Sequence, residues 1–82
     1  MNEDVKTRIS KEDYIRWSDE RKEESFRIKQ MIDLKKERLQ AVSFFSESYS
    51  KIGKDLKILN EMYIEAISDA NRLMEYAESI KE

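Results

Sequence analysis

The chain has 82 residues, with 41% charged and 39% hydrophobic side chains, 16 basic and 18 acidic residues, no cysteine, histidine or proline, and one glycine. Without cysteine, disulfides and thiolate zinc sites are excluded, and without histidine the commonest transition-metal ligand is missing. The near-neutral charge gives no electrostatic reason to expect nucleic acid as a partner. Because strands and tight turns need more glycine and proline than this, the composition favours one all-α domain.

The same residue inventory argues against an enzyme, and we expect neither a cofactor nor a metal. Serine and thiol catalysis lack their usual base and nucleophile. Carboxylate pairs on one helical face, such as Glu61 with Glu65, have basic or polar neighbours, which is typical of a solvated surface. No apolar run approaches the ~18 residues that span a bilayer, so no membrane partner is expected. The acidic N-terminus is unlike a secretory signal, so we expect a cytoplasmic protein, with leaderless export as an alternative.

Residues 1–10 carry few apolar side chains and are expected to form a flexible N-terminal arm. Ser10 followed by Asp13 resembles a capping box, which predicts that the first helix begins near residue 11. No helix-breaking residue follows before Phe45. We therefore expect the first helix to cover about 11–46.

The strongest signal is a run of twelve apolar or aromatic residues at alternating intervals of three and four. This spacing is the heptad pattern of coiled-coil-like packing. Extended toward the N-terminus, the same register meets charged residues at half of its positions. A second apolar stripe beside the first favours a bundle completed by oligomerisation or by a partner chain. The twelve positions are Val42, Phe45, Tyr49, Ile52, Leu56, Leu59, Tyr63, Ala66, Ala70, Leu73, Ala77 and Ile80.

The chain is expected to turn within residues 46–55, where three serines and the sole glycine lie close together. Gly53 is the expected helix cap, so the second helix would cover about 54–81 and Gly53→Ala would destabilise the fold. The heptad runs through this stretch without a skip, which leaves one continuous helix as the alternative. The first interpretation predicts two long antiparallel helices, a helical hairpin. The second predicts a rod of about 105 Å at 1.5 Å per residue.

A charged chain with a long apolar seam and no catalytic chemistry predicts a protein–protein interaction module. We expect an adaptor, chaperone or inhibitor that binds itself or another helical protein. The alternative is a structural coiled-coil rod within a larger assembly. Aromatic and methionine side chains are common at binding surfaces, and those on or near the seam are the candidate contacts. They are Trp17, Met31, Phe45, Tyr49, Met62, Tyr63 and Met74.

In length, absence of cysteine and hairpin pattern, the chain resembles the small helical-hairpin proteins associated with type VII secretion. Members of the WXG100 group carry Trp-x-Gly at the hairpin bend. Here the single tryptophan is Trp17 and the single glycine is Gly53, so that motif is absent. The resemblance implies a further alternative, a small helical partner of a type VII secretion substrate of the WXG100 or LXG kind.

Overall fold

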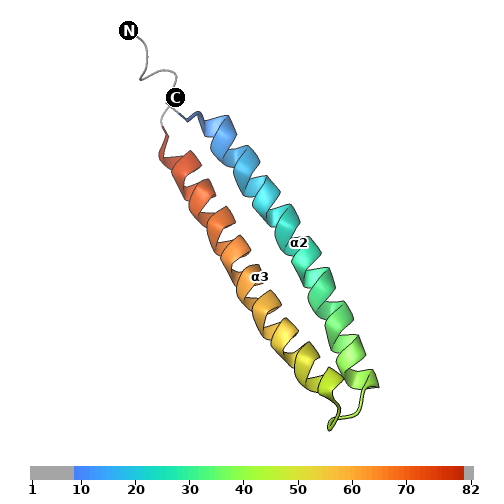
Figure 1. The fold of residues 1–82 in the computed structure, drawn as a ribbon. Coiled ribbons are helices and arrows are strands. Elements are labelled where there is room, and N and C mark those ends of the chain that lie inside the picture. The colour runs from blue at the N-terminus through green and yellow to red at the C-terminus, as the bar shows by residue number, and fades with distance from the viewer. Residues whose placement is uncertain (1–8, 81–82) are drawn as a thin grey trace.

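The structure, a computed structural model, describes residues 9–80 and consists of two antiparallel helices (Figure 1). Helix α2 covers Lys11–Ala41 and helix α3 covers Glu47–Ser79, and a short turn joins them. The hairpin measures 65 × 20 × 14 Å, and the start of α2 and the end of α3 lie together at one end. The predicted all-α helical hairpin is confirmed. The predicted arm over residues 1–10 lies almost entirely outside the described residues.

Helix α2 begins where the sequence predicted it to begin. Ser10 adopts an extended backbone, and its hydroxyl oxygen accepts a hydrogen bond from the Asp13 amide at 3.2 Å. This bond satisfies one of the amides that a helix leaves unpaired in its first turn. Glu12 and Asp13 place two carboxylates in that turn, where the helix dipole favours negative charge.

The turn lies earlier in the chain than predicted, so both predicted boundaries at the bend are wrong. Helix α2 ends at Ala41 rather than near 46, and α3 begins at Glu47 rather than near 54. Ser46 caps α3, because its hydroxyl oxygen accepts a hydrogen bond from the Tyr49 amide at 3.1 Å. Ser46 also donates from its own amide and hydroxyl to the Ser43 carbonyl, at 3.1 and 2.8 Å. Two serines therefore close the turn without a glycine.

The continuous-helix alternative is wrong for the same reason. Val42 has an extended backbone, with φ −107° and ψ 157°, so the helical hydrogen bonds stop there. Gly53, the expected cap, lies inside α3 without a positive φ, and it is exposed. A Cβ added at Gly53 would meet no atom within 4 Å.

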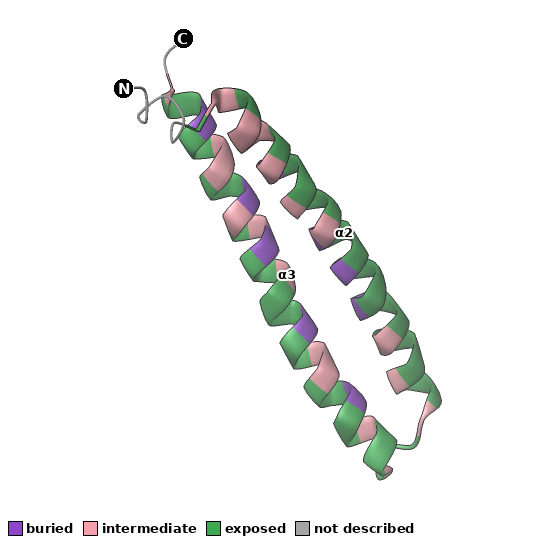
Figure 2. Ribbon diagram, turned by 45° about the horizontal axis from the view of Figure 1, so that its top comes forward, coloured by how far each residue is buried: buried purple, intermediate pink, exposed green. Residues whose placement is uncertain are grey.

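On α3, the burial pattern follows the predicted spacing. Every predicted position from Tyr49 to Ile80 is buried or half-buried, whereas Phe45 at the turn is fully accessible. Figure 2 shows the buried positions along the facing sides of the two helices and exposed positions on the outer sides. The central core combines aliphatic side chains from both helices with one alanine, and Leu56 and Tyr63 pack against it. Its buried members are Ile28, Ile32, Leu59 and Ala66.

On α2, the inward stripe differs from the backward extension of that register. The extension contains Trp17, Glu24, Met31 and Arg38, but the structure turns their C-terminal neighbours inward instead, namely Ser18, Ser25, Ile32 and Leu39. Serines fit because the facing α3 positions toward the open end are alanines. The Ser18 hydroxyl donates to the Ala70 carbonyl at 2.8 Å, so burying this polar group leaves no unpaired hydroxyl. The other positions of the extension, Tyr14, Arg21, Ile28 and Lys35, are buried or half-buried, so only one of its two stripes shifts by a residue. Small polar residues such as Ser18 and Ser25 give no apolar periodicity, which is why the sequence did not single them out.

The position of Gly53 gives a prediction opposite to the one drawn from the sequence. Gly53→Ala should stabilise the protein by up to about 1 kcal/mol, because alanine is the better helix former and the added methyl group meets open space. Urea unfolding of the variant and the wild type measures the difference. A loss of stability would contradict the placement of residue 53 in a helix interior.

The core can be tested with two neighbouring residues. Leu59 is 7% exposed and Ile58 is 55% exposed, one residue apart on α3. Leu59→Ala should lower the free energy of unfolding by about 2–5 kcal/mol, because it removes buried methyl groups and leaves a cavity. Ile58→Ala is the matched control and should change it by less than about 0.5 kcal/mol. Thermal and urea unfolding of both variants decide this, and equal effects would show that the seam is misplaced.

Candidate interaction surface

The hairpin leaves two long sides open, because each helix contacts its partner along one stripe. We call one of them the tryptophan face and define it by Trp17, Met31, Leu34, Ile58, Met62 and Tyr76. On α2, Trp17 and Met31 belong to the stripe immediately beside the inward one. On α3, Met62 and Tyr76 lie beside the inward residues on the same side of the hairpin, and they are fourteen residues apart, which is two heptads. Five of the six side chains, all but Met62, line pockets at this surface.

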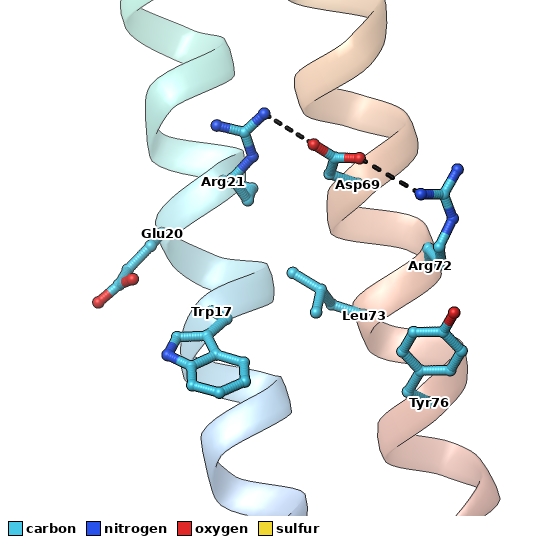
Figure 3. Close-up of a pocket in the computed structure, with 7 residues that line it drawn as sticks. All are labelled: Trp17, Glu20, Arg21, Asp69, Arg72, Leu73 and Tyr76. Atoms are coloured by element: carbon cyan, nitrogen blue, oxygen red, sulfur yellow. Dashed lines mark hydrogen bonds and ion pairs between the residues drawn. The ribbon is translucent and has the colours of Figure 1, made fainter. Parts of the chain in front are cut away.

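At the open end, the tryptophan face holds an aromatic cluster beside an open pocket of about 510 Å³. Tyr14 contacts Trp17 edge-on at 5.9 Å between ring centroids and Tyr76 at 5.6 Å. Figure 3 shows Trp17 on α2 and Tyr76 on α3, with Leu73 pointing toward α2 between them. The pocket is thus lined by an apolar and aromatic group, Trp17, Leu73 and Tyr76, and by four charged side chains, Glu20, Arg21, Asp69 and Arg72.

An ion-pair network borders this pocket. The Arg21 guanidinium donates to Asp69 across the two helices at 2.8 Å, and Arg72 contacts the same carboxylate at 3.7 Å (Figure 3). Arg21 also pairs with Glu24 on its own helix. Desolvation lowers the pKa of Arg21, but the hydrogen bond to Asp69 and the charges of Glu24 and Asp69 outweigh it and raise that pKa. The guanidinium is therefore a permanent cation at this edge.

Midway along the tryptophan face, large aliphatic side chains stand in solvent. Leu34 is 60% exposed and lies one turn from Met31, and Ile58 lies one turn from Met62. Met31 lines two pockets, one with Leu34 and one with Ile58 and Leu59. The Lys35–Asp55 ion pair, at 3.2 Å, crosses the helices next to this patch. The patch thus joins both helices into one apolar surface.

The hairpin tip carries a second group of exposed aromatic side chains. Phe45 is 92% exposed, and its ring contacts Phe44 edge-on at 5.3 Å. Phe44 in turn contacts Tyr49 at 4.9 Å between centroids. Isolated exposed apolar residues are ordinary, but three aromatic rings gathered on one turn form a contiguous apolar surface, which marks interaction sites.

The seven sequence-predicted contacts fall into separate regions. Trp17, Met31 and Met62 lie on the tryptophan face, and Phe45 and Tyr49 lie at the tip. Tyr63 is half-buried, packs against the core and lines a pocket with Phe26 and Ile67 on the opposite side. Met74 is half-buried on α3.

Four exposed contacts were not on the candidate list. They are Leu34, Phe44, Ile58 and Tyr76. A signal existed for two of them, because Leu34 follows Met31 by three residues and Ile58 precedes Met62 by four. Residues with these spacings share a helix face.

Two other kinds of feature are absent from the described residues. Among residues 9–80, no three carboxylates cluster so that they could hold a metal ion. Neither α2 nor α3 has a stretch apolar and long enough to cross a bilayer.

The interhelical ion pair should make a small contribution to stability. Both side chains are about one-third exposed, and such pairs contribute at most about 1 kcal/mol. A double-mutant cycle with Arg21→Ala and Asp69→Ala should give a coupling of about 0.5–1 kcal/mol in urea unfolding at low salt. The coupling should shrink in 1 M salt, because partly exposed charges are screened. No coupling at low salt would contradict the pair.

Comparisons with protein-family models, with curated proteins and with solved structures found no match. The resemblance to hairpin proteins of type VII secretion therefore stays one of length and pattern. The candidate surface has to be interpreted from its own geometry.

Proposed function

We propose that this protein is a non-enzymatic protein–protein interaction module, a small adaptor, chaperone or inhibitor that binds a helical protein through its tryptophan face. One observation carries the proposal. Five large apolar side chains of the tryptophan face are exposed, namely Met31, Leu34, Ile58, Met62 and Tyr76. Exposing apolar surface to water is unfavourable, and contiguous exposed patches of this kind mark binding surfaces.

The shape of the face supports a helical partner. Met31 and Leu34 are three residues apart on α2, and Ile58 and Met62 are four apart on α3. A helix laid between two helices contacts such ridges on both sides, as in helix-in-groove recognition. Methionine adapts to irregular partners because its side chain is unbranched and polarizable. The charged residues that border the patch, such as Lys35 and Arg38, supply a polar rim.

Size supports a partner as well. The described hairpin, residues 9–80, is close to the size of roughly 70–80 residues below which a single core seldom contributes more than about 3–5 kcal/mol, and proteins of that size commonly add disulfides, metals or partners. This chain has no cysteine or histidine, and part of its core is alanine and serine. Binding that covers the exposed face would stabilise the folded state by mass action.

A charge-matched pair of variants tests the proposal. Leu34→Glu with Ile58→Glu should abolish partner binding, because it puts two carboxylates into the apolar patch. Gln30→Glu with Asn71→Glu adds the same charge at exposed polar positions and should leave binding unchanged. Quantitative affinity capture from lysate of the source cells, with wild type and both double variants as bait, measures this.

The expected result is a set of proteins retained by the wild type and the control, and lost by Leu34→Glu with Ile58→Glu. Circular dichroism melting should show both variants folded, since the altered side chains stand in solvent. Equal capture by all three baits would overturn the proposed binding face.

A further inference from the structure

We infer that a second copy of this chain packs antiparallel on the tryptophan face, with the tip of each copy over the Trp17–Leu73–Tyr76 pocket of the other. This inference rests on the proposed function, because it assigns an occupant to the same face. Three independent features support it: the charge distribution, the spacing of the contacts along the hairpin, and the available area.

The hairpin is electrically polarised along its length. The third of the hairpin nearest the tip, residues 35–57, carries six basic and three acidic side chains. The open end, residues 11–24 and 65–80, carries five basic and ten acidic side chains. Two copies side by side in the same direction would bring like charges together, whereas an antiparallel pair brings the basic tip to the acidic open end. Complementary potentials of this kind set the orientation of association.

The spacing of the contacts is symmetric about Met31. A residue of α2 lies at the same height along the hairpin as the residue of α3 for which the two numbers add to about 90. The Arg21–Asp69 and Lys35–Asp55 pairs show this relation. The exposed patch therefore lies at the level of Met31. Trp17 precedes Met31 by fourteen residues and Phe45 follows it by fourteen. A two-fold axis at Met31 thus places the tip of one copy at the aromatic pocket of the other.

The charged residues of the same stripe obey this symmetry. Trp17, Glu24, Met31 and Arg38 recur every seven residues, so they form one line along α2. Glu24 and Arg38 lie seven residues on either side of Met31. The two-fold axis therefore pairs Glu24 of each copy with Arg38 of the other, and the self-complementary contact is isologous.

The face is large enough for a stable dimer. Specific interfaces cover about 800 Å² on each partner. A side of the hairpin measuring 65 by 20 Å exceeds that area.

Charge reversal tests the pairing. Glu24→Arg and Arg38→Glu should each weaken the dimer roughly tenfold in sedimentation equilibrium, because each variant places like charges at both symmetric contacts. The double variant Glu24→Arg with Arg38→Glu should recover wild-type association, since it restores both pairs with reversed sign. Damage to the fold cannot be rescued this way, because the two residues are fourteen apart on one helix, about 21 Å at 1.5 Å per residue.

Cross-linking tests the orientation, and the absence of native cysteine makes it direct. Glu20 and Ala41 are exposed on one side of α2, and they lie at levels almost equidistant from Met31. A mixture of Glu20→Cys and Ala41→Cys chains should form a mixed disulfide dimer under mild oxidation, and neither variant should form its own. Homodimers of Ala41→Cys, or no mixed product, would overturn the antiparallel arrangement.

A wild-type chain that stays monomeric at high micromolar concentration would overturn self-association. That outcome would leave the proposed binding face standing if Leu34→Glu with Ile58→Glu still loses a partner that the control retains. Loss of both the dimer and any face-dependent partner would overturn the two together. The experiments therefore separate the occupant from the surface.

Discussion

A two-helix hairpin has one line of contact, and this constraint governs the rest of the structure. Each helix can turn about one residue in three toward its neighbour, so most side chains remain outside whatever their chemistry. Toward the open end, that line is filled by Ser18 and Ser25 against Ala70 and neighbouring alanines. Small residues let two backbones approach closely, but they bury little apolar area. The large apolar side chains therefore stand on the two open sides.

The register of the two helices depends on a few specific contacts along that line. The Ser18 hydroxyl bonds the Ala70 carbonyl, and two ion pairs, Arg21–Asp69 and Lys35–Asp55, cross the helices on the tryptophan face. Apolar contacts are non-directional, so they tolerate sliding by a turn. A buried hydroxyl and paired charges do not, because a slip would leave them unpaired. The polar contacts thus fix which exposed residues lie at the same height along the hairpin, and hence the shape of the tryptophan face.

This arrangement links stability to binding. The folded hairpin has a modest core and an exposed apolar face, so an occupant of that face would add to the free energy of unfolding. The basic tip and the acidic open end give the surface a direction, which an occupant must match. A self-complementary distribution of this kind suits a second copy, and a helical partner with the same polarity would compete for the same face. Association would then regulate both the fold and the availability of the surface.

The sequence by itself determined the helices, the cap at Ser10 and the inward residues of α3, because these depend on local propensity and on apolar periodicity. It did not reveal the inward residues of α2 toward the open end, since Ser18, Arg21 and Ser25 occupy that stripe there and give no apolar signal. The position of the turn was also predicted wrongly. Hydrogen bonds of Ser43 and Ser46 close the turn, whereas Gly53, on which the prediction relied, has an ordinary helical backbone. Which aromatic and methionine residues share a face was decided by the pairing of the two helices. That pairing joins residues far apart in the sequence, such as Ser18 and Ala70, which are 52 positions apart, and no local pattern records it.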